Sequence, residues 1–230
     1  MKEVIFLDFD GVIVDSIEEC YIVSFDTYFR NDSFQFDNDE YRKLFDEYRY
    51  LVGPVHQFKS LHELIVQLIT NDNIENHPIE LFNKIDNNQS SESKTKYEKI
   101  FFETRRGYQQ NKVQWLEMHK LTEFGKILQK KDDYSNYFII TTKDKGSVKA
   151  LCDYYSININ NIFCKDEFNL LGSKGKIISN FMNNSTYESA IFVDDSVKHL
   201  DSVNDDRVTT FFADWGYDIN QNKYKIYDYL

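Results

Sequence analysis

Two aspartates, Asp8 and Asp10, stand at the end of an apolar run near the start of the chain. Residues 4–7 are β-branched, aromatic and aliphatic with no polar alternation, which is typical of a short buried strand. A buried carboxylate is unfavourable unless it is paired or binds a metal. Gly11 follows and permits a sharp turn. Because ligands bind at the carboxyl ends of strands in open α/β sheets, the sequence predicts that these aspartates belong to a site.

Other chemically capable residues also follow apolar runs or open a helix. Thr141 and Thr142 end one apolar run, and Asp194 and Asp195 end another. Lys174 opens a predicted helix, although the helix dipole favours acidic residues there. Each feature alone is typical of a turn or a helix cap. Their order along the chain predicts that they form one site together with the first two aspartates.

The second half of the chain alternates between strand and helix patterns. We expect strands at 136–142, 161–166, 189–195 and 207–213, and helices at 146–156, at 173–184 and from about 197. Strands that alternate with helices form a parallel sheet with right-handed crossovers.

The stretch from 17 to 113 shows helical periodicity and no strand pattern. We expect helices at 17–31, 39–51, 59–70, 78–86 and 95–112, followed by one at 114–130. The polar run 86–94 predicts a loop between two of them. The predicted fold is therefore a Rossmann-like α/β core, residues 1–16 plus 114–230, interrupted by an all-helical cap domain, residues 17–113.

Four segments resemble the motifs of the haloacid dehalogenase (HAD) superfamily of phosphohydrolases: "FLDFDGVIVDS", "FIITTK", "SKGKII" and "IFVDDS". The resemblance covers the whole predicted core, and it implies a phosphoglycolate-phosphatase-like protein with an inserted helical cap. His199 departs from the pattern, since members often carry Asn or Asp there. Lys176 competes with Lys174 for the third motif, and we prefer Lys174 because it lies on the first helical turn.

The residues at these motifs suit a Mg²⁺-dependent phosphatase. Asp8 would attack the phosphate and form an aspartyl phosphate. Carboxylate and phosphate repel each other, so a cation is needed between them, and Asp8, Asp194 and Asp195 offer the hard oxygens that Mg²⁺ prefers. The resemblance adds the backbone carbonyl of Asp10 to this metal site.

The remaining motif residues would handle protons and the phosphoryl oxygens. Asp10 would be the general acid and base. Thr141 and Lys174 would hold phosphoryl oxygens, assisted by backbone N–H groups around Phe9 and Thr142. Asp15 and Ser16 could line the pocket, but turn formation and helix N-capping explain them equally well, so they are not assigned to the site.

Other functions stay open. A phosphomutase uses the same aspartyl phosphate, and a catalytically silent or signalling phospho-ligand protein is a further alternative. A receiver-type signalling module is disfavoured because its acidic pair follows the first strand, whereas here the acidic pair comes last. A dehalogenase is disfavoured because its site has no aspartate equivalent to Asp10. The cap segment 104–108, "TRRGY", could bind an anionic substrate, although a solvated helix face is favoured, as for Arg42 and Arg49.

Composition limits the partners further. The net charge of −11 argues against a general nucleic-acid surface. The expected partner is a small phosphorylated substrate, because a closing cap excludes bulky polymers. No apolar run approaches the length of a membrane span, and no signal-peptide pattern is visible.

An odd number of distant cysteines without a CxxC pair is expected of free thiols in the cytoplasm. Four histidines show no metal-binding spacing and are expected at the surface or in packing: His56, His62, His77 and His119.

Overall fold

A computed structural model describes residues 2–30, 35–71, 77–218 and 224–227. The chain divides into two compact units, one of Met1–Ser16 with His119–Leu230 and one of Ile17–Met118. The second boundary thus falls five residues later than in the division expected from the sequence. Among the described residues, no helix is long and apolar enough to cross a membrane.

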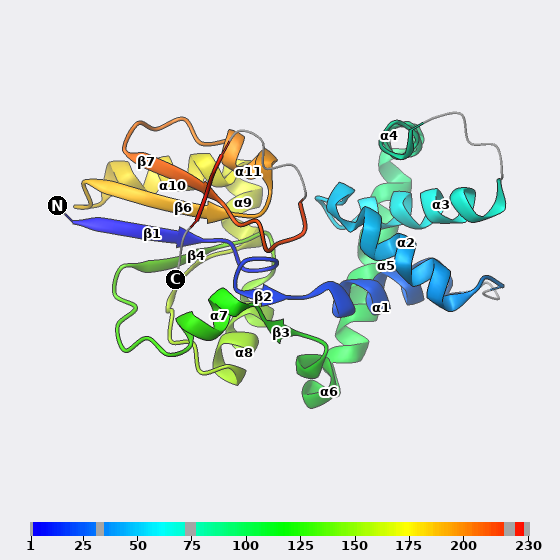
Figure 1. Ribbon diagram of the computed structural model, residues 1–230, viewed down its shortest axis with the longest axis horizontal. Coiled ribbons are helices and arrows are strands. Elements are labelled where there is room, and N and C mark those ends of the chain that lie inside the picture. Colours follow the sequence, from blue (N-terminus) through cyan, green and yellow to red (C-terminus); the bar gives the residue numbers. More distant parts are fainter. Residues whose placement is uncertain (1, 31–34, 72–76, 219–223, 228–230) are drawn as a thin grey trace. The chain divides into compact units, whose positions relative to one another are not determined.

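The first unit contains a six-stranded parallel sheet in the order β5-β4-β1-β6-β7-β8. Figure 1 shows β1 between β4 and β6. This architecture confirms the predicted parallel α/β core, while β8 was not predicted. The strands are β1 (Glu3–Leu7), β4 (Tyr137–Ile140), β5 (Asn161–Phe163), β6 (Ser189–Asp194), β7 (Val208–Phe212) and β8 (Lys225–Ile226).

Helices follow the strands of this unit: α7 (Glu123–Leu128), α8 (Lys145–Tyr154), α9 (Lys165–Leu171), α10 (Lys174–Asn184) and α11 (Val197–Asp201). The helix α10 packs on one face of the sheet, where its Ile178 joins Phe6 and Phe192 in a buried cluster. All three side chains are withdrawn from solvent. Fully burying such a side chain contributes about 1.5–3 kcal/mol, which fixes α10 and its first turn against the strands.

The second unit is helical, and its described residues include no strand. Its helices are α1 (Ile17–Tyr28), α2 (Asn38–Tyr48), the 3₁₀ turn η1 (Arg49–Leu51), α3 (Gln57–Thr70), α4 (Pro78–Asn88), α5 (Ser91–Gln109) and α6 (Lys112–Glu117). The predicted all-helical insertion is thereby confirmed. The first predicted helix extends to residue 31, which lies outside the described residues.

Aromatic packing dominates the interior of the helical unit. Phe58 stacks on Phe45 and on Phe101, with ring centroids 6.1 and 5.6 Å apart and nearly parallel planes. The buried His62 lies beside them. Its Nδ1 accepts from the Tyr41 hydroxyl at 2.7 Å, and its Nε2 lies 2.9 Å from the Ser24 hydroxyl oxygen. Both contacts fit the tautomer that carries its proton on Nε2. His62 is therefore a packing residue of this unit.

The predicted helix at 114–130 was wrong, because a strand interrupts it. The strand β3 (Lys120–Leu121) pairs antiparallel with β2 (Val14–Asp15). Thr122 then begins α7: its hydroxyl accepts from the Gly125 N–H at 2.9 Å and donates to the Val12 carbonyl at 2.7 Å. Pairing with a segment more than a hundred residues away overrides the local helical pattern.

Two other predicted boundaries were wrong for reasons of helix capping. The predicted loop at 86–94 is only residues 89–90, because the Ser90 side chain accepts from the Ser93 N–H and begins α5. The strand predicted to reach 166 ends at 163, since the Glu167 carboxylate accepts from the Cys164 N–H at 2.8 Å and begins α9. Cys164 and the other two cysteines, Cys20 and Cys152, are buried free thiols.

Candidate active site

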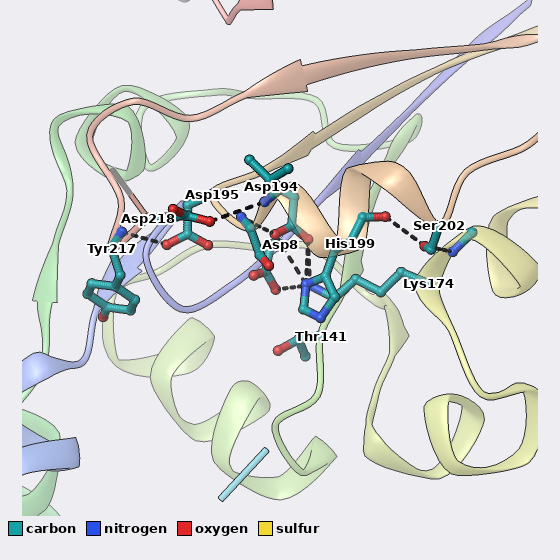
Figure 2. A network of polar contacts seen from close by, with 12 residues as sticks. Asp8, Thr141, Lys174, Asp194, Asp195, His199, Ser202, Tyr217 and Asp218 are labelled. Atoms are coloured by element: carbon teal, nitrogen blue, oxygen red, sulfur yellow. Dashed lines mark hydrogen bonds and ion pairs between the residues drawn. The ribbon is translucent and has the colours of Figure 1, made fainter. Parts of the chain in front are cut away.

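The carboxyl ends of three neighbouring strands bring the predicted acidic residues together. Asp8 follows β1, Thr141 follows β4, Asp194 ends β6 and Asp195 follows it. The Asp8 N–H donates to the Val193 carbonyl at 2.9 Å, which extends the pairing of β1 and β6 to the rim. The side chains of all four predicted residues are at least nine-tenths buried, and Figure 2 shows them in one group.

Lys174 reaches this group from the first turn of α10. Its Nζ lies 2.7 Å from an oxygen of Asp8 and 2.7 Å from an oxygen of Asp194 (Figure 2), and the side chain is 1 % exposed. Gly175, the next residue, lets α10 pack closely against the backbone of Ser202, because a Cβ at this position would lie 1.9 Å from the Ser202 carbonyl oxygen. Lys176, the competing lysine, is exposed.

One ammonium group must therefore serve several carboxylates. Burial raises the pKa of Asp8 to about 6, helped by the charge of Asp194 and opposed by Lys174. Burial likewise raises the pKa of Asp195 well above its usual range, and the neighbouring charges of Asp194 and Asp8 add to this. Burial also opposes ionisation of Asp194, but Lys174 and then His199 outweigh it and lower the pKa of Asp194 to about 2. Asp8 and Asp195 are thus the two carboxylates whose ionised forms the surrounding protein stabilises least.

The arrangement fits a divalent cation beside these two carboxylates. Ligand atoms of Asp8, Asp194 and His199 also lie within 4.8 Å of one another. However, both oxygens of Asp194 accept from protein donors, Oδ2 from the Lys174 ammonium at 2.7 Å and Oδ1 from the Ser196 N–H at 2.8 Å. Lys174 contacts Asp8 through Oδ1. Asp195 accepts a hydrogen bond from the Tyr217 N–H at 2.6 Å, and that uncharged donor does not neutralise it. A hard cation suits such buried, like-charged carboxylates.

Asp10 lies in a separate, basic environment. Its Oδ1 accepts from the Lys143 ammonium at 2.9 Å and from the Ser16 hydroxyl. Burial opposes ionisation, but the charge of Lys143 and these hydrogen bonds outweigh it and lower the pKa of Asp10 to about 2. The sequence interpretation missed Lys143 and did not assign Ser16 to the site. The signal was present, since Lys143 ends the quoted motif "FIITTK".

The predicted phosphate-binding residues have different surroundings. Thr141 is buried and its hydroxyl accepts from the Lys143 N–H at 3.1 Å, whereas the Thr142 side chain is exposed. The Phe9 side chain is fully buried, and its carbonyl accepts from the N–H groups of residues 13 and 14. The sequence predicts that only the backbone N–H groups of Phe9 and Thr142 help to hold the phosphoryl oxygens. That role stays a prediction.

The arginine segment of the cap has a structural partner. Arg105 is buried and forms a bidentate pair with Glu19, with N–O distances of 2.6 and 2.9 Å. The expectation that Arg105 lies on a solvated helix face was therefore wrong. Glu19 neutralises its charge inside the helical unit, without solvent or a substrate. Arg106 is exposed, Arg42 pairs with Glu18 and Asp46, and Arg49 donates to the Val52 carbonyl.

Solved structures share the overall fold at low sequence identity. A "predicted phosphoglycolate phosphatase" from Haemophilus somnus is 13% identical with a TM-score of 0.58, covering 98% of this chain and 93% of that one. A haloacid dehalogenase-like family hydrolase from Streptococcus pneumoniae is 14% identical with a TM-score of 0.52, covering 94% and 86%. Protein Tyrosine Kinase A from Mycobacterium tuberculosis is 12% identical with a TM-score of 0.56, covering 100% and 91%.

These likenesses confirm the HAD-like resemblance at the level of the fold. No protein-family model matches the sequence, and no curated protein is similar enough to match it. Because a protein named as a kinase shares the fold with one named as a phosphatase, the fold alone does not fix the reaction.

Proposed function

We propose that this chain is a Mg²⁺-dependent phosphatase that hydrolyses a small phosphorylated metabolite through an aspartyl phosphate on Asp8. The observation that carries the proposal is the sharing of one buried ammonium, Lys174, between Asp8 and Asp194, with Asp195 left in excess. Three carboxylates facing one lysine leave a local negative charge that a divalent cation would balance. Asp8, Asp195 and the Asp10 carbonyl would hold the ion, while Asp194 anchors Lys174.

Lys174 prepares the site for an anionic substrate. Its ammonium is held between two carboxylates and cannot swing away, so it meets an incoming phosphoryl oxygen without reorganising. The Thr141 hydroxyl is a second donor on the neighbouring strand end. When bound, the cation neutralises charge on the phosphoryl oxygens and lessens their repulsion of the nucleophile.

Asp8 then attacks phosphorus and the ester oxygen leaves with the bonding electrons. Asp10 would donate a proton to that oxygen and afterwards take one from the water that cleaves the aspartyl phosphate. In the free protein Asp10 is held as a carboxylate by Lys143 and Ser16, the form needed for the second step. A phosphate dianion beside it favours proton uptake, because like charges disfavour the ionised form.

The test is release of inorganic phosphate from sugar phosphates, nucleotides, phosphoglycolate and a chromogenic phosphate ester, with Mg²⁺ and with EDTA. We expect Mg²⁺-dependent turnover of at least one ester, which Asp8→Asn and Asp10→Asn abolish or reduce strongly. Asp206→Asn, at an exposed position of the same unit, is the matched control. Isomerised product with little free phosphate would show a mutase instead, and no turnover of any ester would contradict the proposal.

A further inference from the structure

The segment after β7, residues 213–217, contacts the candidate site from the far end of the chain. The Ala213 N–H donates to the Asp194 carbonyl at 3.1 Å, and the Trp215 indole N–H donates to the Val12 carbonyl at 3.1 Å. This segment is thereby attached both to the end of β6 and to the turn that follows β1.

Tyr217 makes the decisive contacts of the segment, one from each end of the residue. Its backbone N–H donates to Oδ2 of Asp195 at 2.6 Å (Figure 2). Its phenol oxygen accepts from the Ser16 N–H at 2.6 Å and donates to Asp15 at 3.3 Å. One residue therefore connects the excess carboxylate to the point where the chain leaves the α/β unit.

Ser16 carries this connection to the other half of the site. Its backbone N–H is held by Tyr217, and its hydroxyl donates to the same Asp10 oxygen that binds Lys143. A path of hydrogen bonds, joined through the covalent frames of Tyr217 and Ser16, thus runs from Asp195 to Asp10.

Asp195 is also confined sterically by two glycines. A Cβ on Gly216 would lie 2.1 Å from the Asp195 Cβ, and a Cβ on Gly11 would lie 2.2 Å from its Oδ2. Gly11 has φ of 85°, a conformation that favours glycine. With backbone on both sides and the Tyr217 N–H on one oxygen, the direction of this carboxylate is set jointly by the 213–217 segment and the turn at Gly11.

We propose that Tyr217 is a positioning residue that joins the two halves of the site: its N–H orients the cation-binding Asp195, and its phenol, through Ser16, orients the acid–base Asp10. The inference rests on the proposed function. It assigns separate tasks to the two ends of one residue, so the two can be disturbed separately.

The phenol is tested with Tyr217→Phe, which keeps the backbone N–H. We expect kcat for an alkyl phosphate to fall on the order of tenfold, the effect typical of one lost hydrogen bond in a positioning network. The fall should be smaller for p-nitrophenyl phosphate, whose leaving group needs little protonation. The Kd for Mn²⁺, measured by electron paramagnetic resonance, should stay within about twofold, because the bond to Asp195 remains. Tyr154→Phe, at an exposed tyrosine, is the matched control.

The path through Ser16 is tested by a double-mutant cycle. If Tyr217 acts through Ser16, then Ser16→Ala alone and the double variant should lower kcat to nearly the same level, since the path is already broken. Multiplicative effects of the two substitutions would overturn the proposal. Urea unfolding of each variant establishes that the comparison is made on folded protein.

The backbone end is tested with Gly216→Ala, which forces Asp195 to move. We expect the Kd for Mn²⁺ to rise by about tenfold or more, whereas Gly107→Ala, where a Cβ meets nothing within 4 Å, should leave it unchanged. If wild type binds Mn²⁺ and hydrolyses esters, and Gly216→Ala and Tyr217→Phe do both equally well, the role of Tyr217 is overturned and the proposed function stands. Wild type that neither binds nor hydrolyses would overturn the proposed function.

Discussion

The nucleophile proposed at position 8 is expected to destabilise the cation-free protein, and Asp8→Asn should reveal this. Burial raises the pKa of Asp8 from 3.8 to about 6, aided by Asp194 and against the pull of Lys174. The folded state therefore holds a proton on Asp8 more tightly than the unfolded state does. Stability falls as pH rises through the window from about 4 to 6, and the whole loss is present above it.

The magnitude follows from that pKa. A rise from 3.8 to about 6 corresponds to about 3 kcal/mol, since each tenfold change in an equilibrium constant is about 1.4 kcal/mol. Asn has the shape of the protonated acid and its oxygen can still accept from Lys174. At pH 7 in EDTA, Asp8→Asn should thus be more stable than wild type by up to about 3 kcal/mol, and at pH 4 the two should be nearly equal.

Urea unfolding followed by circular dichroism at pH 4, 5.5 and 7 measures this difference directly. Repeating the series in saturating Mg²⁺ adds a second comparison, because wild type should gain more stability from the cation than the variant does. Asp206→Asn controls for the removal of one charge from an acidic protein. A variant at position 8 that is equally or less stable than wild type at pH 7 would refute the reasoning that burial and like charge dominate there.

Three further outcomes are expected. Lys174→Met should lower kcat roughly 100- to 1000-fold, as removal of a preorganised donor does, whereas Lys176→Met should leave kcat unchanged. Similar losses in both variants would contradict the assignment of Lys174, and not Lys176, to the site. Glu19→Gln should destabilise the protein by about 3–5 kcal/mol in urea unfolding, because it leaves Arg105 charged and buried, and a loss below 1 kcal/mol would speak against a buried pair. Burial lowers the pKa of His62 to about 3, so the unfolded state binds its proton first and stability falls as pH drops below about 6.5. His62→Gln should then move the acid-unfolding midpoint to lower pH, and an unmoved or higher midpoint would contradict this.

The local residue pattern was enough to predict the architecture and the position of the acids. Apolar runs ending in Asp8, Thr141 and Asp194 predict parallel strands, and parallel strands place their carboxyl ends along one edge of a sheet. The order of the elements also predicts a helical insertion after residue 16. These inferences succeed because strand and helix periodicity are written in neighbouring residues.

Local patterns were misleading where distant segments compete with them. The helix expected at 114–130 is interrupted because Lys120 and Leu121 pair with β2, more than a hundred residues away. Arg105 on an apparently polar helix is buried because Glu19, 86 residues earlier in the chain, neutralises it. Periodicity carries no information about either partner.

Neighbouring residues in the chain were enough to show which acids lie at the rim of the sheet, whereas the partners of those acids depend on how distant segments pack. Lys174 forms ion pairs with Asp8 and Asp194, whereas Lys143 forms one with Asp10. A carboxylate's pKa and its freedom to bind a cation depend on charges and donors within a few ångströms, whatever their separation along the chain. Those distances are set by how the strands, α10 and the 213–217 segment pack together, and no run of neighbouring residues records them.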